Sequence, residues 1–126
     1  MKSFIGAMLI FAILLVSGFA FNSCLNSTSD RLLRSCENIS GKVKTEDFEA
    51  AYKSAEELSK YIDGKKPLIS SILDHGSIDD IETEISELLG YTENKDKINS
   101  IVSLKKLAHM FEHLPENYSV KLQNIL

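Results

Sequence analysis

The sequence of 126 residues has no tryptophan, only two cysteines, two prolines and six glycines. So few cysteines exclude a small fold held by several disulfides, and the scarcity of proline and glycine argues against a collagen-like repeat or a turn-rich all-β chain. Basic residues number 14 against 18 acidic ones, giving a net charge of −4. No broad basic surface is therefore available for a nucleic-acid backbone, and we predict that the chain does not bind nucleic acid.

Apolar side chains make up 44% of the sequence and charged ones 25%, which suits one small folded domain. No segment alternates apolar and polar residues for long enough to indicate a strand, and no internal repeat is evident. Apolar residues instead recur at steps of three and four, which is typical of amphipathic helices. The predicted fold class is all-α: an N-terminal transmembrane or signal helix followed by a small antiparallel helical bundle.

The first 22 residues form the predicted membrane segment. No charge occurs from Phe4 to Phe21, and an 18-residue helix is about 27 Å long, close to the roughly 30 Å of a hydrocarbon core. The same stretch fits a cleaved secretory signal, with Gly18-Phe19-Ala20 as the cleavage site. A third alternative is a lipoprotein with Cys24 as the lipidated residue.

Each of these alternatives leaves the α-amine and Lys2 on the cytoplasmic side, because the first downstream charge, Asp30, lies beyond the apolar run. Arg31 and Arg34 act against this charge bias, since they follow within about 20 residues of the span. The predicted location is the cell membrane, with a single pass and an extracytoplasmic C-terminal domain. The alternative is a secreted protein.

Behind the leader, residues 23–44 are predicted to hold a first helix, over about 28–40, and a linker. Gly41 is placed to end that helix. A bundle domain over 45–126 is expected to open with a helix capped by Thr45 and stopped at Asp63-Gly64.

Pro67 suits the first turn of a third helix, but the apolar groups on either side of residue 75 are out of phase by about half a turn. A break at His75-Gly76-Ser77, with Ser77 as the new cap, is the favoured explanation, and one long helix burying two faces is the alternative. A fourth helix should run from the turn at 92–96 to about Leu114, followed by an apolar tail, 120–126, docked on the bundle.

The string His109-Met-Phe-Glu-His113 matches the H-x-x-E-H pattern of a zinc protease helix. A third ligand and a cleft are not apparent, and both histidines project from the face opposite the apolar stripe. His75 is the remaining candidate ligand. We therefore predict no catalytic residue, no cofactor and no metal, with His109, His113 and His75 as weak metal candidates, and we expect a protein that is not an enzyme.

Cys24 and Cys36 are separated by about 18 Å if one continuous helix carries both, which excludes a bridge between them. The alternatives are a turn that permits a bridge, a disulfide across a homodimer, lipidation of Cys24, or two simple thiols with Cys36 in the core. Asn26, Asn38 and Asn117 begin Asn-x-Ser/Thr triplets, which matter only in a eukaryotic source. The acidic stretch 79–87 is expected to be the solvated side of a helix.

From about Ile69 to Leu126 the chain resembles a bacterial family known as domain-of-unknown-function family 4363. The residues that carry this resemblance are Asp74-His75, Ile78-Asp79-Asp80-Ile81, Leu88-Leu89-Gly90-Tyr91, Asn94-Lys95-Asp96, Leu104, Leu107, His113-Leu114-Pro115-Glu116 and Leu122-Gln123-Asn124-Ile125-Leu126, with Glu46-Asp47-Phe48-Glu49-Ala50-Ala51 earlier. The resemblance implies a bacterial protein with an N-terminal membrane helix and a helical remainder. It implies no enzymatic activity, and it suggests a polytopic membrane protein as partner.

Taken together, these features predict a single-pass, membrane-anchored helical protein that acts by protein contact in the cell envelope. The alternatives are a cleaved secreted binding or signalling factor and a weak metal-binding protein that uses His109 and His113. Expected partners are the membrane itself and a polytopic membrane protein, and a homo-oligomer is compatible with the sequence.

Overall fold

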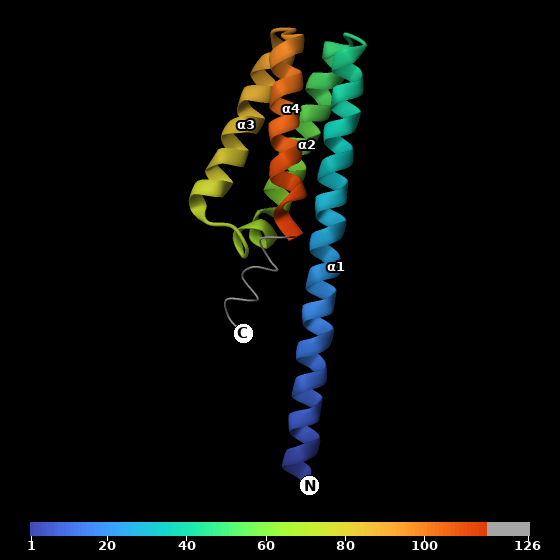
Figure 1. The fold of residues 1–126 in the computed structure, drawn as a ribbon, viewed down its shortest axis with the longest axis vertical. Helices are drawn as coiled ribbons and strands as arrows, with labels where there is room; N and C mark the ends of the chain where they lie inside the picture. The colour runs from blue at the N-terminus through green and yellow to red at the C-terminus, as the bar shows by residue number, and fades with distance from the viewer. Residues whose placement is uncertain (116–126) are drawn as a thin grey trace.

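The structure, a computed structural model, describes residues 1–115, and within that range it holds four helices and no strand (Figure 1). The helices are α1 (Lys2–Lys44), α2 (Phe48–Ser70), α3 (His75–Glu93) and α4 (Lys97–Glu112). The predicted all-α class is confirmed.

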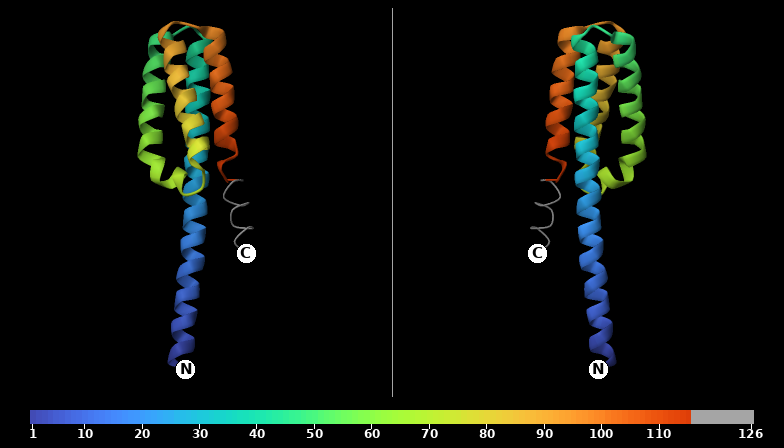
Figure 2. Two further views of the ribbon diagram at one scale, coloured as in Figure 1. Left: turned by 90° about the vertical axis from the view of Figure 1, so that its left-hand side faces the viewer. Right: turned by 90° about the vertical axis from the view of Figure 1, so that its right-hand side faces the viewer.

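The four helices form an up-and-down bundle in which each is antiparallel to its neighbours in the chain (Figures 1 and 2). α1 packs against α2 and α4, and α3 packs against the same two helices. The α1–α2 and α3–α4 turns meet at one end, which we call the distal end. The first half of α1 projects as a single helix beyond the opposite, proximal end (Figure 2).

The core draws apolar side chains from all four helices, and it supplies the main stabilisation of the bundle. The buried apolar residues are Leu25, Leu32, Cys36, Ile39, Val43, Ala51, Ala55, Leu58, Ile62, Ile69, Ile72, Ile78, Ile81, Ile85, Leu88, Leu104, Leu107, Phe111 and Leu114. Phe48 and Tyr61 pack partly buried against this core.

α1 is one helix, so the predicted separate start near residue 28 and the predicted end at Gly41 are wrong. Thr28 donates a hydrogen bond from Oγ1 to the Cys24 carbonyl (2.8 Å), and Ser29 donates from Oγ to the Phe111 carbonyl on α4 (2.7 Å). Because these polar side chains find partners without breaking the backbone ladder, they do not cap a new helix. The cap-forming composition of this segment was therefore misleading.

α2 begins after Asp47, not at the predicted Thr45 cap. The Asp47 carboxylate accepts a hydrogen bond from the Ala50 amide (3.3 Å), whereas Thr45 Oγ1 donates back to carbonyls at the end of α1. The predicted stop at Asp63-Gly64 is also wrong, because α2 continues through Gly64 and Pro67 to Ser70. Ile69 follows these residues and is buried, and its burial stabilises the helical conformation of this last turn of α2.

The predicted break between the two out-of-phase apolar groups is confirmed, and the single long helix is wrong. The break lies at 71–74, a few residues before the predicted site. The new cap is Asp74, which accepts a hydrogen bond from the Ser77 amide (2.8 Å), so Ser77 is the capped residue and not the cap. Hydrogen bonds from Ser77 lower the pKa of Asp74.

α4 follows the predicted turn, with Asp96 as its cap, and ends at Glu112, slightly before the predicted Leu114. The tail 120–126, predicted to dock on the bundle, lies outside the described residues.

The two hairpins, α1–α2 and α3–α4, repeat each other although the sequence shows no evident repeat. Glu46 and Lys95, 49 positions apart, both adopt left-handed backbone conformations, with φ of 63° and 58°. In each turn the amide of the following aspartate bonds to the carbonyl five residues earlier, at 2.9 Å for Asp47 and 2.8 Å for Asp96. Buried residues recur at the same offset, namely Leu32 and Ile81, Cys36 and Ile85, Ile39 and Leu88, Leu58 and Leu107, and Ile62 and Phe111.

Candidate functional site

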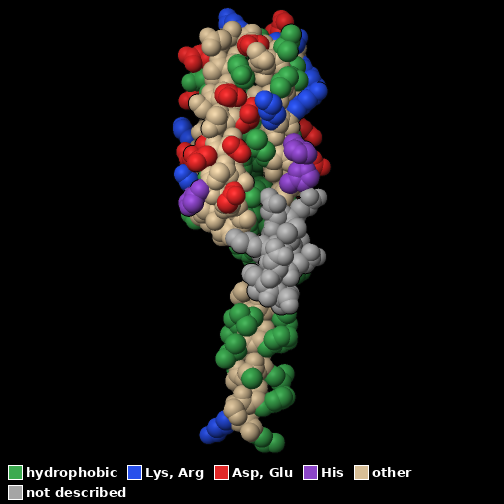
Figure 3. Space-filling view, turned by 60° about the vertical axis from the view of Figure 1, so that its left-hand side comes forward, with side chains coloured by type: hydrophobic (Ala, Val, Ile, Leu, Met, Phe, Trp, Pro, Cys, Tyr) green, Lys and Arg blue, Asp and Glu red, His purple; other side chains and the backbone are tan. Residues whose placement is uncertain are grey.

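The projecting part of α1, residues 2–20, is the most unusual surface of the molecule, and we call it the stalk. Its large apolar side chains are all exposed, from 59% for Leu15 to 78% for Phe19. Figure 3 shows hydrophobic side chains along the stalk and charged side chains over the bundle. Exposed apolar surface of this extent is unfavourable in water. The helix is long and apolar enough to cross a membrane or to act as a signal segment.

The bundle begins where the stalk ends. Phe21 packs against the core, and Leu25 is the first fully buried residue of the chain. The small residues Gly18 and Ala20 belong to the helical turn just before this boundary. A tether and a removable leader are both compatible with this boundary, because no core residue precedes it.

The structure brings two of the three candidate histidines together. The rings of His109 and His113 lie edge to face, with centroids 4.4 Å apart, at the proximal end of α4. His75 is exposed at the start of α3 and does not join them. Over residues 1–115, no group of three or more His, Cys, Asp or Glu side chains is arranged to hold a metal ion.

The acidic stretch 79–87 is only partly solvated, so the prediction that it forms the solvated side of a helix is wrong for Glu84. Glu82 forms an exposed ion pair with Lys66 (2.8 Å), and this hydrogen bond raises the pKa of Lys66. Glu84, in contrast, is 8% exposed, and its Oε1 has no hydrogen-bond partner in the described part of the chain. Glu84 is three residues after Ile81 and four before Leu88, so its helical position already indicated the buried face.

The two cysteines lie on one helix and form no disulfide with each other. Cys24 is exposed near the proximal end, whereas Cys36 is a buried core residue. Burial, together with the neighbouring Glu37 carboxylate, raises the pKa of the Cys36 thiol to about 12. Cys36 is therefore a packing residue and a poor nucleophile.

We expect a maleimide reagent at neutral pH to label one thiol per folded chain and two per unfolded chain. Only Cys24 is accessible in the fold, because Cys36 is buried and holds its proton. Mass spectrometry of labelled protein measures the number of adducts, and Cys24→Ser is the control that should abolish labelling of the folded chain. An unlabelled folded wild-type chain would contradict a free Cys24 and favour lipidation or a disulfide between copies.

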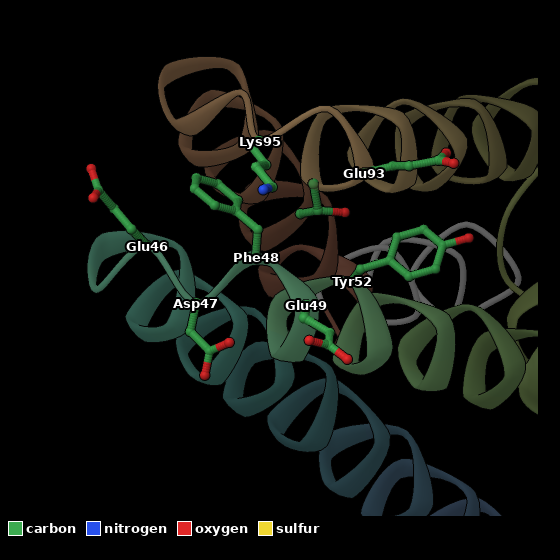
Figure 4. A pocket seen from close by; sticks show the side chains of 8 residues that line it. Glu46, Asp47, Phe48, Glu49, Tyr52, Glu93 and Lys95 are labelled. Atoms are coloured by element: carbon green, nitrogen blue, oxygen red, sulfur yellow. The ribbon is translucent and has the colours of Figure 1, made fainter.

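A cavity of about 440 Å³ lies at the distal end, between the start of α2 and the end of α3. Phe48 and Tyr52 line it from α2, and Glu46 and Asp47 line it from the turn before α2 (Figure 4). Its other lining residues are Glu49, Thr92, Glu93 and Lys95. This mixture of acidic, aromatic and basic side chains contains no nucleophile paired with a base, so it supports no specific chemistry.

A larger groove of about 620 Å³ runs between α1 and α4. Its floor holds Leu33, Cys36, Ile101, Leu104 and Ala108, with Ser40 and Gly41 beside them. Four charged side chains border it: Glu37, Lys44, Lys105 and Glu112. Long grooves between helices with an apolar floor are typical contact sites for another helix.

A family model described as Domain of unknown function (DUF4363) matches residues 19–125. The chain belongs to this family. The match begins at the end of the stalk and covers all of α2, α3 and α4, so it extends well beyond the stretch from Ile69 that carries most of the resemblance. No curated protein and no solved structure matches the chain.

Proposed function

We propose that this family member is a single-pass membrane protein whose helical bundle lies outside the cytoplasm and acts by contact with another membrane or envelope protein. The observation that carries the proposal is the continuity of α1, whose first half is an exposed apolar stalk and whose second half builds the bundle core. A helix shared in this way would hold the bundle in a fixed orientation close to the lipid surface.

The charges of the sequence support the proposed orientation. Lys2 is the only charged side chain before Asp30, so the positive end of the stalk favours the cytoplasmic side. The bundle surface carries charged side chains over its helices (Figure 3), as expected of a domain in an aqueous compartment.

The surface chemistry supports a contact role and not catalysis. Among the described residues, the clustered histidines lack a third ligand, and the distal cavity lacks a paired nucleophile and base. The α1–α4 groove, by contrast, has the apolar floor and charged border of a protein contact. We accordingly propose that the chain is not an enzyme and that it binds no cofactor.

Reporter fusions at the C-terminus test the topology. We expect alkaline phosphatase, which is active only after export, to be active, and a fluorescent protein that matures only in the cytosol to stay dark. Retention of the chain in carbonate-washed membranes is the second expected result. Bright cytosolic fluorescence or release by carbonate would overturn the proposal.

Site-specific photo-crosslinking in native membranes tests the partner. With the photoreactive residue placed in turn on each exposed helix face, we expect adducts to a second membrane or envelope protein from one face of the bundle only. Adducts spread evenly over all faces, or none to another protein, would contradict a specific contact.

The location of the bundle boundary favours one alternative, a cleaved secreted factor. Cleavage after Ala20 would leave every core residue in place, because the first contact with the core is made by Phe21. Sequencing of the mature N-terminus decides between them: a chain that begins at Phe21 would exclude the tether.

A further inference from the structure

The α1–α4 groove carries an inference that goes beyond the proposed function and rests on its membrane anchor. Apart from Met1 and the stalk, only two large hydrophobic side chains in the described range are exposed, Ile98 (76%) and Val102 (44%). Both lie on α4, seven and three residues before Lys105, so they share the side of α4 that borders the groove. The two exposed apolar side chains thus adjoin the groove at Lys105, without lining it.

The internal repeat shows that the fold does not require apolar residues there. The positions of α2 that correspond to Ile98 and Val102 are Glu49 and Lys53, both exposed and charged. The position that corresponds to Leu33 in the groove is Glu82, which forms an ion pair with Lys66. Apolar side chains at these positions of the α1–α4 face are therefore not needed for the fold. We interpret them as a surface that another protein covers.

The register of the two helices places complementary groups at equal heights. The hydrogen bond of Ser29 to the Phe111 carbonyl (2.7 Å) and the ion pair of Lys97 with Glu46 (3.7 Å) fix α1 antiparallel to α4. Counting along both helices at equal rise, Glu37 is level with Lys105 to within about one helical turn. Gly41 is level with about residue 100, between Ile98 and Val102.

We propose that a second copy of this chain occupies the groove, about a two-fold axis parallel to the helices. Both copies would be anchored in the same membrane, so they would point the same way, and such an axis preserves height. Ile98 and Val102 of each copy then pack over Gly41 of the other, and Glu37 of each copy pairs with Lys105 of the other. Neither Glu37 nor Lys105 takes part in the two ion pairs found within the described chain.

Gly41 is suited to receive these side chains. It is exposed, and a Cβ built on it would meet no atom within 4 Å, so the space above it is open. The charges that border the groove, two acidic and two basic, make the surface self-complementary. A partner of strongly single-signed charge would match this border less well.

Reciprocal charge reversal tests the proposal on the full chain in detergent or nanodiscs. Glu37→Lys places like charges opposite each other in its homodimer, and Lys105→Glu does the same. A mixture of the two variants restores both attractive pairs in the heterodimer. We expect each variant alone to dimerise at least about tenfold more weakly than wild type, and the mixture to recover wild-type affinity.

Light scattering measures the mass of the homodimers, and co-purification of two differently tagged chains measures formation of the heterodimer. Far-UV circular dichroism confirms that each variant is folded. A monomeric wild-type chain, or single variants that dimerise as well as wild type, would overturn the proposal.

A pair of glycine variants provides an independent test with a matched control. Gly41→Leu should fill the groove and abolish the dimer, whereas Gly90→Leu, at the corresponding position of the other hairpin, should leave it intact. Neither Cβ meets an atom within 4 Å, so both chains should fold. Loss of a crosslink to a different protein in Gly41→Leu, with the dimer retained, would assign the groove to that protein instead.

Carbonate extraction of the same samples separates the two proposals. A chain that stays in the membrane but fails the pairing tests refutes the dimer alone. A chain that carbonate releases refutes the anchor, and with it the reason for a parallel axis.

Discussion

Replacing Phe11 and Leu14 with arginine is expected to move the chain from the membrane fraction to the soluble fraction. Each charge at the centre of a membrane helix costs about 2.5–3.5 kcal/mol, so the pair opposes insertion by roughly 5–7 kcal/mol. Both side chains are exposed in the stalk, at 64% and 65%, and make no contribution to the core. The bundle should therefore keep its fold while the anchor is lost. Immunoblotting of carbonate-washed membranes and supernatant measures the shift.

Val102→Arg is the matched control for this experiment, since it also replaces an exposed large hydrophobic side chain with arginine but lies on the bundle. It should stay fully in the membrane fraction. If the stalk variant also remained there after the carbonate wash, the stalk would not be the anchor.

Phe111→Ala is expected to destabilise the bundle by about 3–5 kcal/mol, which is the range for removal of a buried phenylalanine side chain. Phe111 is completely buried, and its carbonyl accepts the hydrogen bond from Ser29 that joins α4 to α1. The truncation opens a cavity at this contact. Urea unfolding of the full chain in detergent, followed by circular dichroism, measures the change.

The comparison for Phe111→Ala is Lys106→Ala on the same helix, which shortens an exposed side chain outside the groove. Its effect should stay within about 0.5 kcal/mol. Equal effects of the two variants would show that the α4 contact to α1 is not a main source of stability.

The helical elements could be predicted where apolar spacing was regular. The stripe through Ala51, Leu58 and Ile62 predicted the buried face of α2, and the phase change near residue 75 predicted a break. The ends of the helices were harder, because Thr45 and Ser77 can form caps and the choice depends on competing local hydrogen bonds. In the structure Asp47 and Asp74 are the caps, because their carboxylates accept hydrogen bonds from backbone amides in the first turn of the helix.

Some features of the candidate sites could likewise be predicted from helical phase, and others could not. Helical phase placed His109 on an exposed face and Cys36 in the core, as observed. The buried Glu84 was missed because an acidic stretch was judged by its composition, although its spacing to Ile81 and Leu88 placed it on the buried face. The α1–α4 groove could not be predicted at all, since its two walls are more than 50 residues apart in the sequence.

By itself, the sequence determined that the chain is helical and that its first part is apolar enough to enter a membrane, because both properties depend on local spacing and composition. Only the tertiary structure decided that stalk and bundle share one helix. The reason is an interaction between residues distant in sequence. Ser29 donates a hydrogen bond to the Phe111 carbonyl on α4, so its side chain is paired while the polar segment after the stalk stays helical. The repeat of two hairpins and the groove between α1 and α4 likewise arise only from packing, where residues separated along the chain bury their apolar faces together.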